Sequence, residues 1–128
     1  MSGYKYIFDT NANITLFQEN EVFVKKIEHA DYIGISFISA IEFISFPALS
    51  LSDKLLFKQF LIQVEIAGAS TADFGTLEII AINKAEYKLK IPDIIIAHSA
   101  MVNLATLITN DKKISKVAGL KTISFKLN

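Results

Sequence analysis

Residues 6–11 read Y-I-F-D-T-N, a short apolar run that ends at one acid and two small polar residues. In an open α/β sheet, ligands bind in the crevice beyond the carboxyl ends of the strands, so an acid placed where a strand ends points toward that crevice. Asp9 is therefore the first candidate site residue. Asp is also a favourable helix N-cap, and a helix is expected directly afterwards, so a purely structural role for Asp9 stays open at this point.

The length and composition predict one globular domain, residues 1–128, with a substantial core. Hydrophobic residues make up 52% of the chain and its mean hydropathy is +0.40, which favours an oligomer that covers apolar surface. Every apolar run is interrupted before it reaches the length of a membrane span, and the first residues lack a signal-peptide pattern. We therefore expect a cytoplasmic protein that does not enter the membrane.

The inventory of side chains limits the possible chemistry. The chain has no cysteine and only two histidines, which argues against thiolate zinc sites, a cysteine nucleophile and histidine-rich metal sites. A metal ion would have to be held by oxygen. The formal net charge is zero, so the overall charge does not indicate a nucleic-acid partner. Lysines gather near the C-terminus, where either a solvated face or an RNA path is a possible interpretation.

Strands and helices alternate along the sequence. Apolar and β-branched runs predict strands at 6–8, 32–37, 62–66, 106–109 and 121–125. Helical spacing and capping residues predict helices at 13–28 (one or two), 39–46, 53–60, 72–88 and 92–103. The predicted caps are Ser39, Ser52 with Asp53, and Ser70 with Thr71. This alternation predicts an α/β fold in three layers, with a mainly parallel central sheet of four to five strands and helices on both faces.

Three further acids stand at places equivalent to that of Asp9. Glu42 and Asp93 lie in the first turns of the helices predicted at 39–46 and 92–103, and Asp111 follows the strand predicted at 106–109. In a parallel sheet these places share the carboxyl edge, where four carboxylates would repel one another unless cations neutralised them. Hard divalent cations such as Mg²⁺ and Mn²⁺ prefer such oxygen ligands. The sequence therefore points to a metal-dependent phosphodiesterase site.

Each of these acids also has a purely structural interpretation. Ser39 and Glu42 have the spacing of a capping box, in which the serine caps the helix and the glutamate bonds back to it. Asp93 follows Pro92 and complements the positive end of the helix dipole. Asp111 is suited to cap a short helix predicted at 112–117. Taken singly, none of these acids decides between a cap and a ligand.

Four segments together resemble the PIN domain, and specifically the VapC-like toxins of bacterial type II toxin-antitoxin systems. They are Y-I-F-D-T-N (6–11), S-A-I-E-F-I-S-F-P (39–47), Y-K-L-K-I-P-D-I-I-I-A (87–97) and A-T-L-I-T-N-D-K-K-I (105–114). The chain departs from the family at Asn13, where an apolar residue is usual, and it has no arginine, so Lys84 stands near the place of a common family arginine. None of these departures affects the four acids.

The resemblance implies an endoribonuclease that binds Mg²⁺ or Mn²⁺. By resemblance, the catalytic residues and metal ligands are Asp9, Glu42, Asp93 and Asp111. The first three are expected to hold the catalytic ion, and Asp111 is expected to complete the site or orient water. Thr10 and Asn11 shape the first loop, and Thr109 and Asn110 support the last one. Lys84, Lys112 and Lys113 are weaker candidates for RNA contacts. The family relationship further implies an RNA substrate, a homodimer and a small antitoxin partner. The alternative is a PIN-like RNA-binding or partner-binding module with little turnover.

Overall fold

A computed structural model describes residues 5–17, 25, 30–67 and 74–125 of the chain. The strands are β1 (Lys5–Phe8), β2 (Tyr32–Ser36), β3 (Glu65–Ala67), β4 (Thr106–Ile108) and β5 (Thr122–Ile123). The helices are α1 (Thr10–Phe17), α3 (Phe37–Ile44), α4 (Leu51–Gln63), α5 (Phe74–Tyr87), α6 (Ile91–Val102) and the 3₁₀ turn η1 (Ile114–Lys116). No helix within the described ranges has the length and apolar character that a membrane span requires.

The strands form one parallel sheet in the order β3-β2-β1-β4-β5. β1 lies at its centre, with Ile7 paired to Gly34 of β2 on one side and to Leu107 of β4 on the other. This topology confirms the predicted α/β fold with its mainly parallel sheet. Because β1 is central, the residues that follow it lie in the middle of the carboxyl edge.

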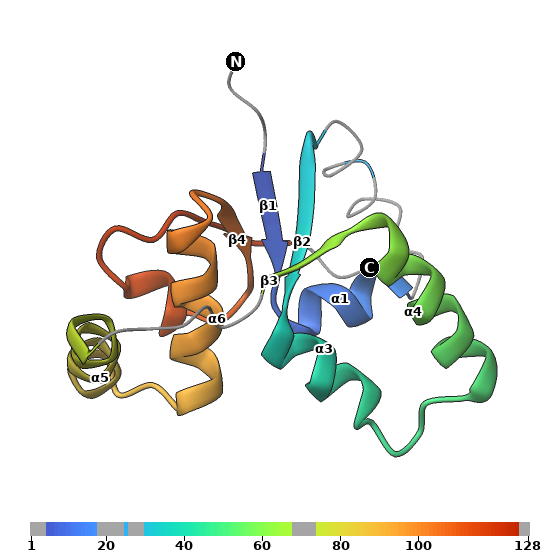
Figure 1. Ribbon diagram of the computed structural model, residues 1–128, viewed down its shortest axis with the longest axis horizontal. Helices are drawn as coiled ribbons and strands as arrows, with labels where there is room; N and C mark the ends of the chain where they lie inside the picture. The colour runs from blue at the N-terminus through green and yellow to red at the C-terminus, as the bar shows by residue number, and fades with distance from the viewer. Residues whose placement is uncertain (1–4, 18–24, 26–29, 68–73, 126–128) are drawn as a thin grey trace.

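The side chains of β1 alternate between two core layers. Ile7 packs in the cluster that includes Ile94 and Ala97 of α6, whereas Tyr6 and Phe8 pack on the other face with Ala12 of α1. Figure 1 shows α5 and α6 on one side of the sheet and α1, α3 and α4 on the other. Helix α6 packs against the sheet, with five of its residues in the interior: Ile94, Ile96, Ala97, Ser99 and Ala100.

Several predicted helix ends were wrong. Helix α3 begins at Phe37 and is capped by Ser36, whose hydroxyl accepts a hydrogen bond from the Ile38 amide, so the predicted capping box of Ser39 and Glu42 does not form. Helix α4 is capped by Ser50 through the Asp53 amide. In both cases an earlier serine is the cap, because it is the last residue with extended backbone before the helix.

Other predicted elements differ in length or lie beyond the description. Helix α4 continues through Ile62, which was predicted to begin a strand, and β3 is correspondingly short. Helix α1 covers the start of the helical segment predicted at 13–28, and the remainder of that segment lies outside the described residues apart from Lys25, which is helical. The predicted cap at Ser70 and Thr71 is outside them too.

Candidate active site

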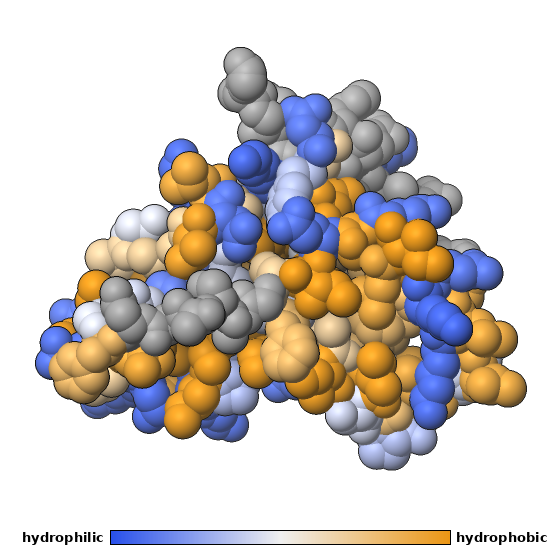
Figure 2. All heavy atoms as spheres, in the orientation of Figure 1, coloured by the Kyte–Doolittle hydropathy of each residue, from blue (hydrophilic) through white to orange (hydrophobic). Residues whose placement is uncertain are grey.

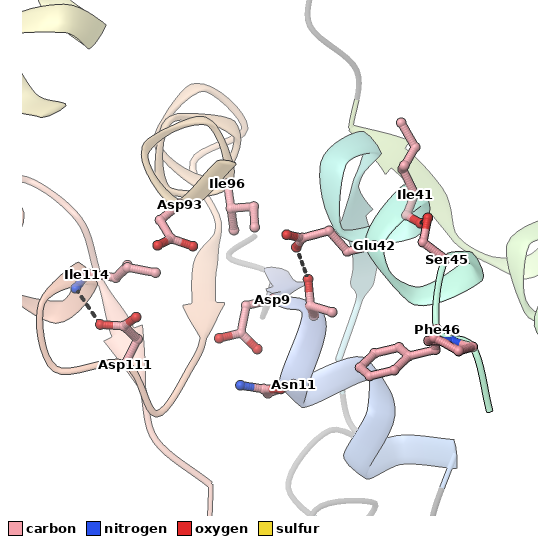
Figure 3. Close-up of a pocket in the computed structure, with 12 residues that line it drawn as sticks. Asp9, Asn11, Ile41, Glu42, Ser45, Phe46, Asp93, Ile96, Asp111 and Ile114 are labelled. Atoms are coloured by element: carbon pink, nitrogen blue, oxygen red, sulfur yellow. Dashed lines mark hydrogen bonds between the residues drawn. The ribbon is translucent and has the colours of Figure 1, made fainter. Parts of the chain in front are cut away.

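The four predicted acids line one cavity of about 560 Å³ at the carboxyl edge of the sheet. Figure 3 shows the carboxylates of Asp9, Glu42, Asp93 and Asp111 facing this common space from different parts of the chain. Asp9 follows β1, Glu42 belongs to α3, Asp93 to α6, and Asp111 follows β4. Thr10 and Asn11 also line the cavity, but they are the first residues of α1 and not part of a loop as predicted. The fold thus brings together acids that are up to 102 positions apart in the sequence, Asp9 and Asp111.

Asp9 caps α1 and faces the cavity at the same time. Its Oδ1 accepts a hydrogen bond of 2.7 Å from the Ala12 amide, as an N-cap does, and the side chain of Thr109 bonds to it as well. Burial raises the pKa of Asp9, and the negative charges of Asp111 and Asp93 raise it further, while these hydrogen bonds oppose the rise. The two interpretations of Asp9 therefore do not exclude each other.

Thr109 connects two of the acids. Its hydroxyl accepts a 3.0 Å hydrogen bond from the Asp111 amide and bonds to the carboxylate of Asp9, and its side chain is almost fully buried. Asp111 in turn accepts hydrogen bonds at Oδ1 from the amides of Lys113 and Ile114. These contacts fix the loop that carries Asp111. The helix predicted at 112–117 is only the turn η1, whose N-cap position is Lys113 and not Asp111.

Asn110 has a different role from its neighbour. Its amide group makes two hydrogen bonds of 2.8 Å with the backbone of Phe125, one donated and one accepted. This side chain therefore ties the loop after β4 to the segment that follows β5, and it does not line the cavity.

Glu42 is held by a residue from another helix. The hydroxyl of Thr10 donates a hydrogen bond to Glu42 Oε1, and Figure 3 shows this bond pointing the carboxylate into the cavity. Helix α1 packs against α3, so the first residue of α1 reaches the middle of α3. The carboxylate is thus partnered across the helix pair and not within its own helix.

Asp93 lies in the first turn of α6, after Pro92. The pKa of Asp93 is raised, mainly by burial and then by the charges of Asp111 and Glu42, while Lys90 and Lys113 lower it. The acids therefore influence one another across the cavity, which is the electrostatic situation that a bound cation relieves.

The donors facing the cavity suit a hard divalent ion. Four of the lining residues are acids, and Mg²⁺ and Mn²⁺ favour such oxygen ligands. Within the part of the chain that the structure describes, no three acids or histidines lie close enough together to enclose a metal ion. The acids share one space without closing around a single point.

Of the three lysines predicted as candidates for RNA contacts, only two lie beside the acids. Lys112 and Lys113 line a second hollow beside the acids, but Lys84 lines neither space. The sequence analysis missed Lys88 and Lys90, which line the same hollow as Lys112. Their position directly before the segment I-P-D was a usable signal, since residues at the start of α6 lie at the same edge as Asp93.

The cavity also has an apolar rim that was not predicted as part of the site. It is formed by Ile41, Phe46 and Pro47, all of them exposed, at and beyond the end of α3. On the face shown in Figure 2, apolar residues extend over the region of α3 and α4. Exposed residues of these elements include Phe37, Ile44, Leu51, Leu55 and Leu56.

Comparisons with known proteins agree with this architecture. VapBC2 from Rickettsia felis bound to a DNA fragment from their promoter has a chain that is similar with a TM-score of 0.78 and 20% identity, covering 94% of this chain and 98% of that one. A chain of a toxin-antitoxin complex from Klebsiella pneumoniae is similar with a TM-score of 0.70 and 27% identity, and the match covers 91% of this chain and 95% of that one. A chain of DNA-bound VapBC from Salmonella typhimurium is similar with a TM-score of 0.76 and 19% identity, and the match covers 94% of this chain and 98% of that one.

A search among curated proteins gave no match. The family model described as the PIN domain, in contrast, matches residues 6–120, which include all four acids and every strand except β5. This match confirms the resemblance that the sequence motifs indicated. The chain belongs to the PIN domain family.

Proposed function

We propose that this protein is a VapC-like toxin, an endoribonuclease that depends on Mg²⁺ or Mn²⁺. The observation that carries this proposal is the convergence of Asp9, Glu42, Asp93 and Asp111 on one cavity. Two of these acids have raised pKa values to which the charges of the others contribute. Perturbed acids that gather in a cleft are typical of catalytic sites.

The residues of the chain would divide the work in the following way. Asp9, Glu42 and Asp93 would hold the ion, and Asp111 would complete the site. When bound, such an ion stabilises negative charge on phosphoryl oxygens and makes water a better nucleophile. Thr109 orients Asp9, and Thr10 orients Glu42. Partners of this kind fix the direction of ligand oxygens and commonly determine metal affinity.

The comparisons support an antitoxin partner. Solved structures similar to this chain come from VapBC and toxin-antitoxin complexes. The exposed apolar side chains of α3 and α4 offer a surface that a small protein would cover, since large apolar patches commonly mark interfaces. We further propose a homodimer, in agreement with the high mean hydropathy of the chain. An RNA substrate together with such a partner implies a cytoplasmic location.

Cleavage of a mixed tRNA and ribosomal RNA pool tests the nuclease proposal. The purified protein is assayed with Mg²⁺, with Mn²⁺ and with a chelator, beside Asp9→Asn and Asp93→Asn. We expect cleavage that the chelator abolishes and that falls about 100-fold or more in both variants, because each loses a charged ligand. Asp53→Asn is the matched control, since Asp53 lies on α4 and lines neither cavity. A folded wild type, free of copurified antitoxin, that cuts nothing would overturn the proposal.

The second candidate is an RNA-binding or partner-binding module with little turnover. The observation that favours it is that no three of the described acids enclose a point where an ion would sit. The same assay separates the two functions. A binding module would retain RNA in a gel-shift experiment with or without the chelator, and the wild type and Asp93→Asn would leave the RNA equally intact.

A further inference from the structure

A second hollow, of about 370 Å³, adjoins the acidic cavity and shares Asp93 and Asp111 with it. Its walls carry four lysines from two turns of the chain: Lys88, Lys90, Lys112 and Lys113. The acidic cavity, by contrast, has no lysine among its lining residues. The local charge therefore changes sign across the two shared aspartates. We call this second space the lysine pocket.

The lysines are close enough to the acids to act on them electrostatically. Lys90 and Lys113 lower the pKa of Asp93, in opposition to the burial and the acids that raise it. All four lysine side chains are exposed, so they remain hydrated and available to an anion. Leu89, which lies between Lys88 and Lys90, is 4% exposed and anchors this turn in the core.

Both turns that carry the lysines are closed by hydrogen bonds. The turn after α5 has the Leu89 amide bonded to the Lys84 carbonyl at 3.0 Å and the Lys88 amide bonded to the Ala85 carbonyl at 3.3 Å. This is the helix C-terminal pattern that usually places glycine at the position of positive φ, and here Lys88 has φ 55°. The turn after β4 is closed by the hydrogen bonds that Asp111 accepts from Lys113 and Ile114.

We propose that the lysine pocket binds a backbone phosphate of the RNA strand next to the phosphate that is cleaved. This inference rests on the proposed nuclease function. Four carboxylates repel a polyanion, so a strand that places one phosphate among them gains from cations at the neighbouring position. Lysine provides a point charge that suits phosphate without specifying a base. The pocket thus gives affinity and the direction of the strand, not sequence preference.

The test compares two variants that lose the same charge at different places. Lys88→Gly combined with Lys112→Gln removes one cation from each turn of the pocket. Glycine fits the positive φ at position 88, so the turn is kept. Lys90 and Lys113 stay in place, so the cations that act on Asp93 are unchanged. The matched control is Lys54→Gln with Lys58→Gln, two exposed lysines of α4 that line neither space.

Binding of a labelled single-stranded RNA oligonucleotide is measured by fluorescence anisotropy in EDTA over a series of KCl concentrations. We expect the pocket variant to bind severalfold more weakly than the control at low salt. The slope of log affinity against log salt should be shallower by about 0.7, since the pocket holds one phosphate and each single-strand phosphate contact contributes about 0.7. Equal binding by the two variants, or no binding by the wild type, would overturn the inference.

A cleavage assay in Mn²⁺ keeps this inference separate from the nuclease proposal. A wild type that cleaves RNA, with a pocket variant that binds RNA as the control does, would refute the pocket and leave the nuclease intact. A wild type that binds RNA through these lysines but never cleaves it would overturn the nuclease function, and with it the place of the contact beside a cleaved phosphate.

Discussion

Asp9 and Glu42 face the same cavity, but different parts of the chain hold them there. Asp9 is bonded to the Ala12 amide, three positions further along the chain. Glu42 is bonded to the hydroxyl of Thr10, which is 32 positions away and on another helix. The position of Asp9 is thus encoded where a strand meets a helix, whereas that of Glu42 depends on how α1 docks against α3. One site therefore contains an acid that is positioned by a local contact, Asp9, and an acid that is positioned by a tertiary contact, Glu42.

Substitution of Asp9 is expected to have the largest effect and separates its two roles. Asp9→Asn keeps a good N-cap, so stability should be retained while cleavage falls about 100-fold or more. Asp9→Ala should lose cleavage to the same extent and also lose about 1 kcal/mol of stability with the cap. RNA cleavage and urea unfolding measure the two effects. Full activity of Asp9→Asn would mean that Asp9 is only a cap.

The same difference explains what the sequence could predict. The strand that precedes Asp9, the cap at Asp9 and the alternation of strands and helices depend on neighbours in the sequence, and the structure confirms them. The family motif also located all four acids. The partner of Glu42 was not predictable, because Ser39 had a suitable spacing while the fold used Ser36 as the cap and Thr10 as the partner.

The lysine pocket was missed for a similar reason. Lys88 and Lys90 belong to the turn before α6, and Lys112 and Lys113 to the turn after β4. No sequence pattern states that these two turns meet beside Asp93. The turn after β4 leads into η1, which packs against α6, so the two turns come together only in the folded chain. The place of Lys88 and Lys90 before I-P-D indicated the edge of the sheet, but nothing indicated that they meet Lys112 and Lys113 there.

Substitution of Thr10 tests the tertiary contact that positions Glu42. Thr10→Val keeps the shape of the side chain but removes the hydroxyl that bonds to Glu42. We expect a loss of about 10-fold in cleavage, because an unoriented ligand weakens metal binding. Thr10→Ser, which keeps a hydroxyl, is the control and should retain most of the activity. If the valine variant cleaves like wild type, Glu42 needs no partner and the proposed role of α1 docking is wrong.

The packing of α1 can also be examined at Asn13, one helical turn after Thr10. Asn13 is fully buried, and neither polar atom of its amide has a hydrogen-bond partner among the described residues. We expect Asn13→Leu to raise the free energy of unfolding by about 1–2 kcal/mol, because burial of an unbonded amide is costly. Urea unfolding measures this change.

A buried hydroxyl in the same helix provides the control. Thr15 is 3% exposed, and its hydroxyl donates a 2.9 Å hydrogen bond to the Asn11 carbonyl. Thr15→Val removes a polar group that is satisfied and should give no increase in stability. A loss of stability in Asn13→Leu equal to that in Thr15→Val would show that the Asn13 amide is well bonded, and the excess cost assigned to it would be wrong.

The smallest expected effect is a change in stability with pH, which arises because the acids around Asp93 act on its carboxylate. Burial, and then Asp111 and Glu42, raise the pKa of Asp93 above its ordinary value of 3.8. Between that value and the higher folded pKa, the native state binds more protons than the unfolded chain, so stability falls as the pH rises through this window. Asp93→Asn should therefore be more stable than wild type at pH 7.5 in EDTA, and this advantage should vanish below the window.

Metal addition should reverse this order, because an ion that binds only the native state stabilises it. Thermal unfolding at pH 7.5 is then expected to show a larger gain on adding Mn²⁺ for wild type than for Asp93→Asn, with Asp53→Asn responding as wild type does. If Asp93→Asn is less stable than wild type in EDTA, the carboxylate is favourable to the fold without any ion. Asp93 would then be a mainly structural acid at the start of a helix, and repulsion among the cavity acids would no longer support a metal site.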